Sequence, residues 1–385
     1  MKDISIYFSS IEEFKDYSEL QLGGRLIKHT EGNFPEIKSK GIAIFHVPEY
    51  RGSKSNADQI QSEKFRNYLY ELNFGIGWSM PVYDLGNILP GAEIKDTFHA
   101  IKNVVTELVK QNVIPVIIGG TQDLTMAMYK GYEGLEQMVN LCSVDYSFDL
   151  GEPEIDIHSE GYLSHLLLQR PCYLFNHSNI GLQAPFASKA EFDLFEKLYF
   201  DVCRLGEFNA DFKKAEPHLR NSDLLSIDLR SIRSSELASA DYFQPNGFYA
   251  DQICQIAKYA GISDKLTSLG LFNYFPEKEL GSLSALVGQI IWYFMDGVSQ
   301  RKADFPIGSK KNYTKFVVSF DDFKDTLVFY KSDKSDRWWL EVSYPEAMGS
   351  KYERHHMVPC DKEDYDRAMN NEVPDLWWKT YQKYV

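Results

Sequence analysis

The chain has 385 residues, of which 44% are hydrophobic and 25% are charged, and its formal net charge is −14 at pH 7. This length and composition suit a soluble globular protein with a large core, built as one α/β domain with or without an appendage. The negative charge argues against nucleic acid and anionic membranes as main partners, because both are negatively charged themselves.

No apolar run in the sequence approaches the roughly 18 residues that a transmembrane helix needs. The first residues also lack the basic and apolar regions of a signal peptide. Five cysteines without pairwise spacing predict reduced thiols rather than a disulfide framework. We therefore expect a cytoplasmic protein that does not insert into a membrane.

The first 40 residues are mixed in character and predict an N-terminal arm. From residue 42 onward, short apolar runs alternate with amphipathic segments. We expect strands at 42–47, 81–85, 113–118, 138–144, 172–182, 223–228 and 266–272, and helices at 57–72, 94–111, 123–132, 188–198, 249–260 and 279–296. Such alternation is typical of right-handed βαβ units. Residues 1–302 are thus predicted to form a three-layer αβα domain with a mostly parallel central sheet.

The sequence changes character at about residue 303. Short strands are predicted at 315–320, 326–330 and 338–342, and a helical region at 361–384, so we expect a small α+β appendage over residues 303–385. The appendage carries four of the six tryptophans: Trp338, Trp339, Trp377 and Trp378. They either pack the appendage onto the main domain or offer a contact surface to a protein partner. The adjacent pair His355-His356 is expected to be exposed to solvent.

Three stretches place polar residues after an apolar run. The run at 140–144 is followed by Asp145, Ser147 and Asp149, which an extended backbone would direct to one face. The run ending in Gly119-Gly120 precedes Gln122, and a third run leads to Asp228 and Arg230. In an open α/β sheet, ligands bind at the carboxyl ends of the strands, so these stretches are expected to form one site.

These stretches resemble the signature motifs of the ureohydrolase family, which comprises arginase, agmatinase and formimidoylglutamase. The family motifs are Gly-Gly-Asp-His, Asp-Ala-His-x-Asp and Ser-x-Asp-x-Asp, whose residues hold two manganese ions that convert a bridging water into a hydroxide. The resemblance extends from about residue 20 to about residue 300, and the block from Asp145 to Leu167 is most similar to formimidoylglutamase. It implies an arginase-like fold, and homo-oligomers are usual in the family.

At four family positions this chain carries a different residue. Gln122 and Ser147 stand where the family has metal-binding histidines, and Arg230 stands at the second aspartate of the last motif. Leu271 falls at the place of the glutamate that binds the substrate. Arg230 cannot bind a metal, because its guanidinium has no lone pair to donate. We predict that its charge neutralises part of the carboxylate cluster in place of the second metal.

The family's metal ligands that remain are Asp145, Asp149 and Asp228. Together with the amide oxygen of Gln122 they form an all-oxygen set, which suits one hard cation such as Mg²⁺ or Mn²⁺. The resemblance therefore implies at most one divalent cation, and no cofactor is the leading expectation. His158 matches the family's substrate-loop histidine and is the only catalytic candidate. As a lone loop histidine, it is alternatively a surface hydrogen-bonding group.

Three functions stay open. The favoured hypothesis is a non-catalytic pseudoenzyme that serves in binding, scaffolding or regulation, because it explains all four departures together. The alternative is a hydrolase of C–N bonds in linear amidines or guanidines, which works with a single metal or an altered site and for which formimidoyl-glutamate is the substrate to test. The third is a sensor that binds a small cationic or amidine metabolite without turnover. A small amidine or carboxylate ligand is thus a possible partner of the pocket, and Arg230 could bind a carboxylate if the hydrolase hypothesis holds.

Overall fold

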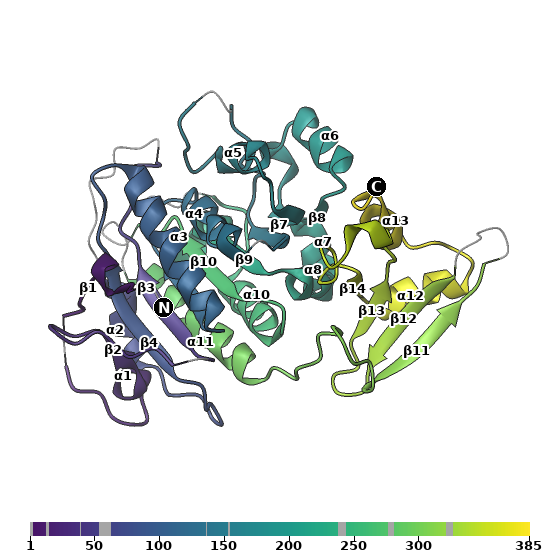
Figure 1. Cartoon of the computed structure of the whole chain (residues 1–385). Helices are drawn as coiled ribbons and strands as arrows, with labels where there is room; N and C mark the ends of the chain where they lie inside the picture. Colours follow the sequence, from purple (N-terminus) through teal and green to yellow (C-terminus); the bar gives the residue numbers. More distant parts are fainter. Residues whose placement is uncertain are drawn as a thin grey trace.

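A computed structural model describes residues 3–12, 15–38, 40–53, 63–135, 137–152, 155–237, 244–275, 281–320 and 326–385. The main sheet is formed by β1 (Phe8–Ser9), β2 (Ile27–Lys28), β3 (Ile42–His46), β4 (Val82–Ile88), β5 (Ile114–Ile118), β6 (Val139–Val144), β7 (Leu174–Leu182), β8 (Asp201–Arg204), β9 (Leu224–Asp228) and β10 (Ser268–Phe272). Its strand order is β1-β4-β3-β5-β10-β9-β6-β7-β8, with β2 paired to β4 (Figure 1). Every pairing except that of β1 with β4 is parallel, which confirms the predicted mostly parallel sheet.

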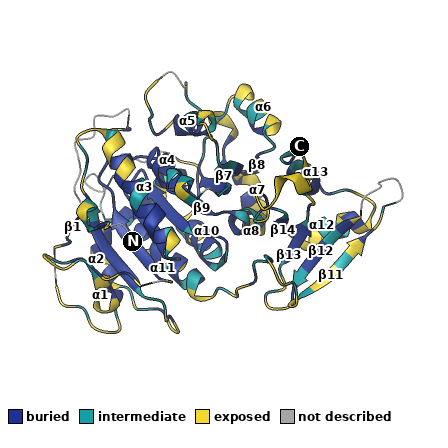
Figure 2. Ribbon diagram, viewed as in Figure 1, coloured by how far each residue is buried: buried dark blue, intermediate teal, exposed yellow. Residues whose placement is uncertain are grey.

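Helices cover both faces of this sheet. They are α1 (Leu22–Arg25), α2 (Lys64–Glu71), α3 (Ile94–Lys110), α4 (Leu124–Lys130), α5 (Tyr162–Leu168), α6 (Lys189–Lys197), α7 (Leu205–Ala210), α8 (Ala215–Asn221), α9 (Ser234–Leu237), α10 (Ala250–Ile262) and α11 (Ser282–Ser299). Alternate residues of one strand enter two different cores: Ile42 and Ile44 join the core under α2, α10 and α11, whereas Ala43 and Phe45 join the core under α3 and α4. Burial on both faces explains the continuous apolar runs of the strands. The three-layer αβα prediction is confirmed (Figure 2).

The strand order positions the candidate site. Strands β5, β10, β9 and β6 are adjacent and parallel, so their carboxyl ends form one continuous edge. Val144, the last residue of β6, is paired with Ile227 of β9. Asp145 and Asp228 follow these two residues and therefore lie on neighbouring strand ends.

Some elements differ from the prediction. The short elements β8, α7 and α8, all within residues 201–221, were not predicted. The helical region 361–384 is divided into α12 (Lys362–Met369) and α13 (Asp375–Gln382). Asn371 between them has a φ of 67°, and Pro374 begins the second helix, so both residues interrupt a continuous helix. The first residues of the helices predicted at 57–72 and 279–296 lie outside the described residues.

The appendage contains a separate antiparallel sheet. It is built from β11 (Tyr313–Val318), β12 (Leu327–Ser332), β13 (Trp338–Glu341) and β14 (Met357–Cys360), in that order. Three of its four tryptophans are buried, and only Trp378 is largely exposed, at 51%. The expectation of an exposed His355 is wrong: its side chain is 2% exposed, and its Nε2 lies 3.0 Å from the Met138 carbonyl oxygen. Most of the aromatic content therefore forms the appendage core.

The appendage contacts the main domain near the amino ends of the parallel strands. Phe175, at the start of β7, packs in the same hydrophobic cluster as the appendage core. Asp223, directly before β9, accepts a 2.7 Å hydrogen bond from Arg354 of the appendage. The buried Arg220 of α8 donates to the carbonyl oxygens of Trp338 and Cys360, at 2.8 and 2.9 Å. The appendage is thus at the opposite end of the strands from Asp145 and Asp228, to the right of the main sheet in Figure 1.

Across the described ranges, no helix combines the length and the apolar character needed to cross a bilayer.

Candidate functional site

Gln122 lies at the carboxyl end of β5, after a sharp turn of the backbone. Gly119 and Gly120 have φ values of 117° and 52°, and a Cβ atom on Gly119 would lie 2.6 Å from the His46 ring. Glycine is therefore required at this turn. The Gln122 side chain is fully buried, and its Nε2 donates to the Ser226 hydroxyl of β9 at 2.9 Å. A neutral hydrogen bond thus joins two strand ends at the place where the family has a metal-binding histidine.

Asp145 and Asp149 are brought together by a turn rather than by strand alternation. Strand β6 ends at Val144, and Asp149 has a left-handed φ of 53°, so the expectation of an extended backbone here is wrong. Ser147 lies between the two carboxylates. Its backbone N–H donates to Asp145 Oδ1 at 3.0 Å, and its hydroxyl donates to Asp149 Oδ1 at 2.9 Å. Ser147 therefore links the two carboxylates by hydrogen bonds.

Arg230 forms a close ion pair with Asp228. Strand β9 ends at Asp228, and Leu229–Ser231 form a 3₁₀ turn, so Arg230 lies in this turn and not in the strand. The backbone N–H of Arg230 donates to Asp228 Oδ1 at 2.7 Å. Its Nε and Nη2 donate to Oδ2 of the same carboxylate, at 3.1 and 2.9 Å. Both oxygens of Asp228 are thus engaged by one residue.

The three aspartates are all buried, so their negative charges are poorly solvated. Burial, together with the charges of Asp149 and Asp228, raises the pKa of Asp145 well above its usual value. Burial raises the pKa of Asp149 to about 7, although the Arg230 charge acts in the opposite direction. Burial alone would lower the pKa of Arg230, but Asp228 and Tyr146 raise it, so the guanidinium stays charged. One arginine does not balance three carboxylates, and the site also favours a bound proton.

The donor set does not fit two manganese ions. Asp228, which would bridge both ions in the family, directs both carboxylate oxygens to Arg230. Within the described part of the chain, no group of three or more His, Cys, Asp or Glu side chains is arranged to hold a metal ion. A single ion on Asp145, Asp149 and Asp228 stays a prediction, and it requires these side chains to turn toward one another.

A cleft of about 520 Å³ is connected to this site through Glu160, which lines the cleft and lies 3.6 Å from Arg230 Nη1; the three aspartates and Arg230 are not among the described lining residues. It is lined by two loop segments: Arg51, Gly52 and Ser53 from one, and Gly151, Glu152, Ile155, Asp156, Ile157, His158 and Glu160 from the other. His158 is in the wall of this cleft, where its Nδ1 accepts the backbone N–H of Glu160 at 3.2 Å. Leu271, which the resemblance aligns with the family's substrate glutamate, is instead fully buried within β10.

Two acidic residues near the site were missed in the sequence. Glu160 lies 3.6 Å from Nη1 of Arg230, a contact between distant loops that no local pattern signals. Asp123 is fully buried, neither of its carboxylate oxygens accepts a hydrogen bond of ordinary geometry from the described residues, and burial raises its pKa to about 7. Its position directly after Gln122 could have identified it as a site residue in the sequence.

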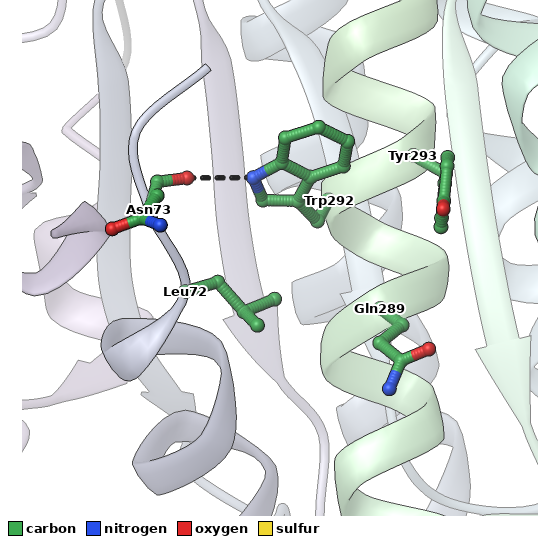
Figure 3. Close-up of a pocket in the computed structure, with 5 residues that line it drawn as sticks. All are labelled: Leu72, Asn73, Gln289, Trp292 and Tyr293. Carbon is green, nitrogen blue, oxygen red and sulfur yellow. Dashed lines mark hydrogen bonds between the residues drawn. The ribbon is translucent and has the colours of Figure 1, made fainter.

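A second, smaller groove lies far from the predicted site residues, on the helical face formed by α2 and α11. Its volume is about 270 Å³, and it is lined by Leu72, Asn73, Gln289, Trp292 and Tyr293 (Figure 3). The indole N–H of Trp292 donates to the Asn73 carbonyl oxygen at 2.7 Å and fixes the ring against the end of α2. None of the predicted site residues lines this groove.

Asp149→Asn is expected to stabilise the protein at pH 8. A carboxyl group with a raised pKa in the folded state favours folding below its unfolded pKa, and this contribution is lost as the pH rises to the folded pKa. For Asp149 this loss of stability takes place between pH 3.8, its ordinary pKa, and about pH 7, its pKa in the folded protein. Asparagine keeps the acceptor for Ser147 and tolerates a positive φ. The free energy of unfolding of the variant should exceed that of the wild type by on the order of 1–3 kcal/mol at pH 8, and by less at pH 5.

Urea unfolding of both proteins at pH 5 and pH 8, with a chelator present, measures this difference. Parallel stability profiles for the two proteins would show that Asp149 does not carry the pH dependence.

The described fold is similar to those of several solved structures. Formimidoylglutamase from Bacillus subtilis matches with a TM-score of 0.66 and 16% identity, covering 75% of this chain and 95% of that protein. Trypanosoma cruzi formiminoglutamase, solved with manganese, matches with a TM-score of 0.62 and 16% identity over 73% of this chain and 99% of that one. Agmatine ureohydrolase of Thermoplasma volcanium matches with a TM-score of 0.58 and 15% identity over 74% and 96%. At these identities the likeness establishes the fold alone.

The sequence comparisons give the family. No curated protein sequence matches the chain. The model of the Arginase family matches residues 42–295, which is well over half of the chain. The chain therefore belongs to the arginase family, the ureohydrolases.

Proposed function

We propose that this chain is a non-catalytic member of the arginase family, which binds a small ligand at the carboxyl edge of its sheet. The observation that carries the proposal is the Arg230–Asp228 pair, in which the backbone N–H and the guanidinium of Arg230 together engage both oxygens of a carboxylate that metal ions would need. Arginine cannot donate electrons to a metal. A hydroxide bridging two manganese ions is therefore unavailable to this site.

Two further residues support the same proposal. Gln122 and Ser147 replace imidazole ligands with neutral groups, and each already has a hydrogen-bonding role within the site. Because these bonds tie together strand ends and carboxylates, the residues stabilise the site as a structure. The cleft connected to this site through Glu160 retains the volume for a small ligand. A binding or sensing role requires only that cleft.

A turnover assay tests the proposal. Purified protein, either treated with chelator or supplied with Mn²⁺, is incubated with formimidoyl-L-glutamate, agmatine and L-arginine. We expect no product above that of a control without protein. Product that forms with the wild type and disappears with Asp228→Asn would establish a hydrolase instead.

The second candidate function is a hydrolase of linear amidines that uses one metal or an altered site. The observation in its favour is a set of buried oxygens that accept no hydrogen bond of ordinary geometry from the described residues: Gln122 Oε1, Asp145 Oδ2 and Asp149 Oδ2. Such oxygens are costly unless a donor or a cation reaches them. A cation or an amidinium nitrogen would satisfy them. Formimidoyl-glutamate is the first substrate to test.

We also propose that the appendage binds a protein partner. The contact surface is smaller than four tryptophans would suggest, because three of them are buried. Trp378 and Tyr381 of α13 are exposed on one side of this helix, and their rings are stacked at a centroid distance of 6.3 Å. We also propose that the protein forms a homo-oligomer, because oligomers are usual in the family. Its five cysteines without pairwise spacing favour a cytoplasmic location.

A further inference from the structure

The guanidinium of Arg230 has an outer edge that the site does not use fully. Its inner edge, Nε and one N–H of Nη2, is bound to Asp228. The outer edge presents Nη1 and the second N–H of Nη2. Among the described residues Nη1 makes no hydrogen bond, and Glu160 Oε1 at 3.6 Å is its partner in a long ion pair. A planar fork of this kind binds a carboxylate through two parallel hydrogen bonds.

Glu160 lies between this outer edge and the cleft. It lines the cleft and at the same time faces Arg230. Its side chain is 43% exposed, compared with 19% for Arg230, so it can move toward solvent without breaking the core. Asp228 and the Tyr146 ring, whose centroid is 5.9 Å from the guanidinium carbon, hold the fork in place. The fork is therefore preorganised, and the carboxylate of Glu160 faces it across the 3.6 Å ion pair.

The cleft wall carries exposed acidic side chains, whose charge is opposite to that of Arg230. Glu152 and Asp156 are exposed in this wall. Arg51 also lines the cleft, but its guanidinium is bound to Glu49 and to the carbonyl oxygens of residues 91 and 92. A ligand with a carboxylate directed inward and a cationic nitrogen directed outward matches this arrangement of charge.

We propose that the outer edge of Arg230 is the receptor for the carboxylate of a small zwitterionic ligand, and that Glu160 occupies this place until the ligand displaces it. The proposal rests on the proposed function, because it assumes that Arg230 remains on Asp228 and that no metal pair forms. It gives the binding role a ligand class and names the residue that competes with the ligand.

The test uses three matched probes: 4-aminobutyrate, which carries both charges, butyrate, which carries only the carboxylate, and butylamine, which carries only the cation. Binding to the full-length protein is measured by ligand-observed NMR titration. The expected order of affinity is 4-aminobutyrate, then butyrate, then butylamine. Glu160→Gln should tighten the binding of both carboxylates by roughly 10-fold, because it removes the competing charge. Glu196→Gln, the same change at an exposed position on α6, should have no effect.

Two arginine variants complete the test. Arg230→Gln should weaken both carboxylates at least about 10-fold. Arg230→Lys keeps the charge but lacks the fork, so its affinity for the two carboxylates should lie between those of the wild type and Arg230→Gln. It replaces the glutamine variant in this test if that variant does not fold. The proposal is overturned if butylamine binds best and Glu160→Gln weakens the binding of butylamine. It is also overturned if neither carboxylate binds to the wild type or to Glu160→Gln.

These outcomes are separate from those of the turnover assay. Carboxylate binding in the expected order together with product formation would refute the non-catalytic role but support the Arg230 receptor. The absence of both binding and turnover would refute the receptor alone.

Discussion

Arg220→Ala should lower the free energy of unfolding by about 3–5 kcal/mol, the range for removing one partner of a buried charged network. Arg220 is buried, and its guanidinium donates to two carbonyl oxygens of the appendage, at 2.8 and 2.9 Å. It also pairs with Glu216 at 3.0 Å and lies 4.6 Å from the Trp339 ring. Truncation to alanine removes the guanidinium donor from the two carbonyl oxygens and one of the cationic partners of Glu216. The main domain and the appendage would therefore lose a central attachment.

Urea unfolding measured by tryptophan fluorescence is suited to this variant, because four of the six tryptophans lie in the appendage. The matched control is Arg25→Ala. Arg25 is exposed on α1, and its guanidinium lies over the Phe74 ring at 5.1 Å, so this change should cost less than about 1 kcal/mol. Equal effects of the two substitutions would contradict the role assigned to Arg220.

Arg230→Ala should also be strongly destabilising in the presence of a chelator, by roughly 2–4 kcal/mol, somewhat less than for a fully buried pair because the side chain is 19% exposed. The reason is that Asp228 loses its counter-charge next to Asp145 and Asp149. Combining the change with Asp228→Asn should recover most of the loss, because the charge that Arg230 compensated most directly is then removed as well. Equilibrium unfolding of the two single variants and the double variant gives the coupling energy.

Metal ions provide a second comparison for the same variant. If Arg230 replaces a cation, millimolar Mn²⁺ should restore part of the stability of Arg230→Ala and leave that of the wild type unchanged. A wild type stabilised by Mn²⁺ as much as the variant would mean that Arg230 does not take the place of a metal.

The central fold could be predicted because its strands are buried on both faces. Strands such as β3, β5 and β9 are continuous apolar runs, and the structure places each within two residues of its predicted bounds. The elements β8, α7 and α8 were missed because they are short, and packing rather than periodicity decides their conformation. In the appendage, the charged helices α12 and α13 gave one continuous helical pattern despite Pro374.

The candidate site could be predicted as a set of residues but not as a geometry. Linear motifs identified Asp145, Asp149, Asp228 and Arg230. The turn after each strand could not be predicted, since it depends on side chains such as those of Ser147 and Asp228 that bond to the backbone or to neighbouring carboxylates. Contacts between distant loops, such as that of Glu160 with Arg230, carry no local signal at all.

Calorimetric titration of Mn²⁺ into chelator-stripped protein, with Asp145→Asn as the control, tests the central claim most directly. The claim is that Arg230 excludes a dinuclear metal centre from this member of the arginase family. We predict no binding, or a single weak site that is lost in Asp145→Asn. Two sites that disappear together in Asp145→Asn would contradict the claim and restore a dimanganese hydrolase.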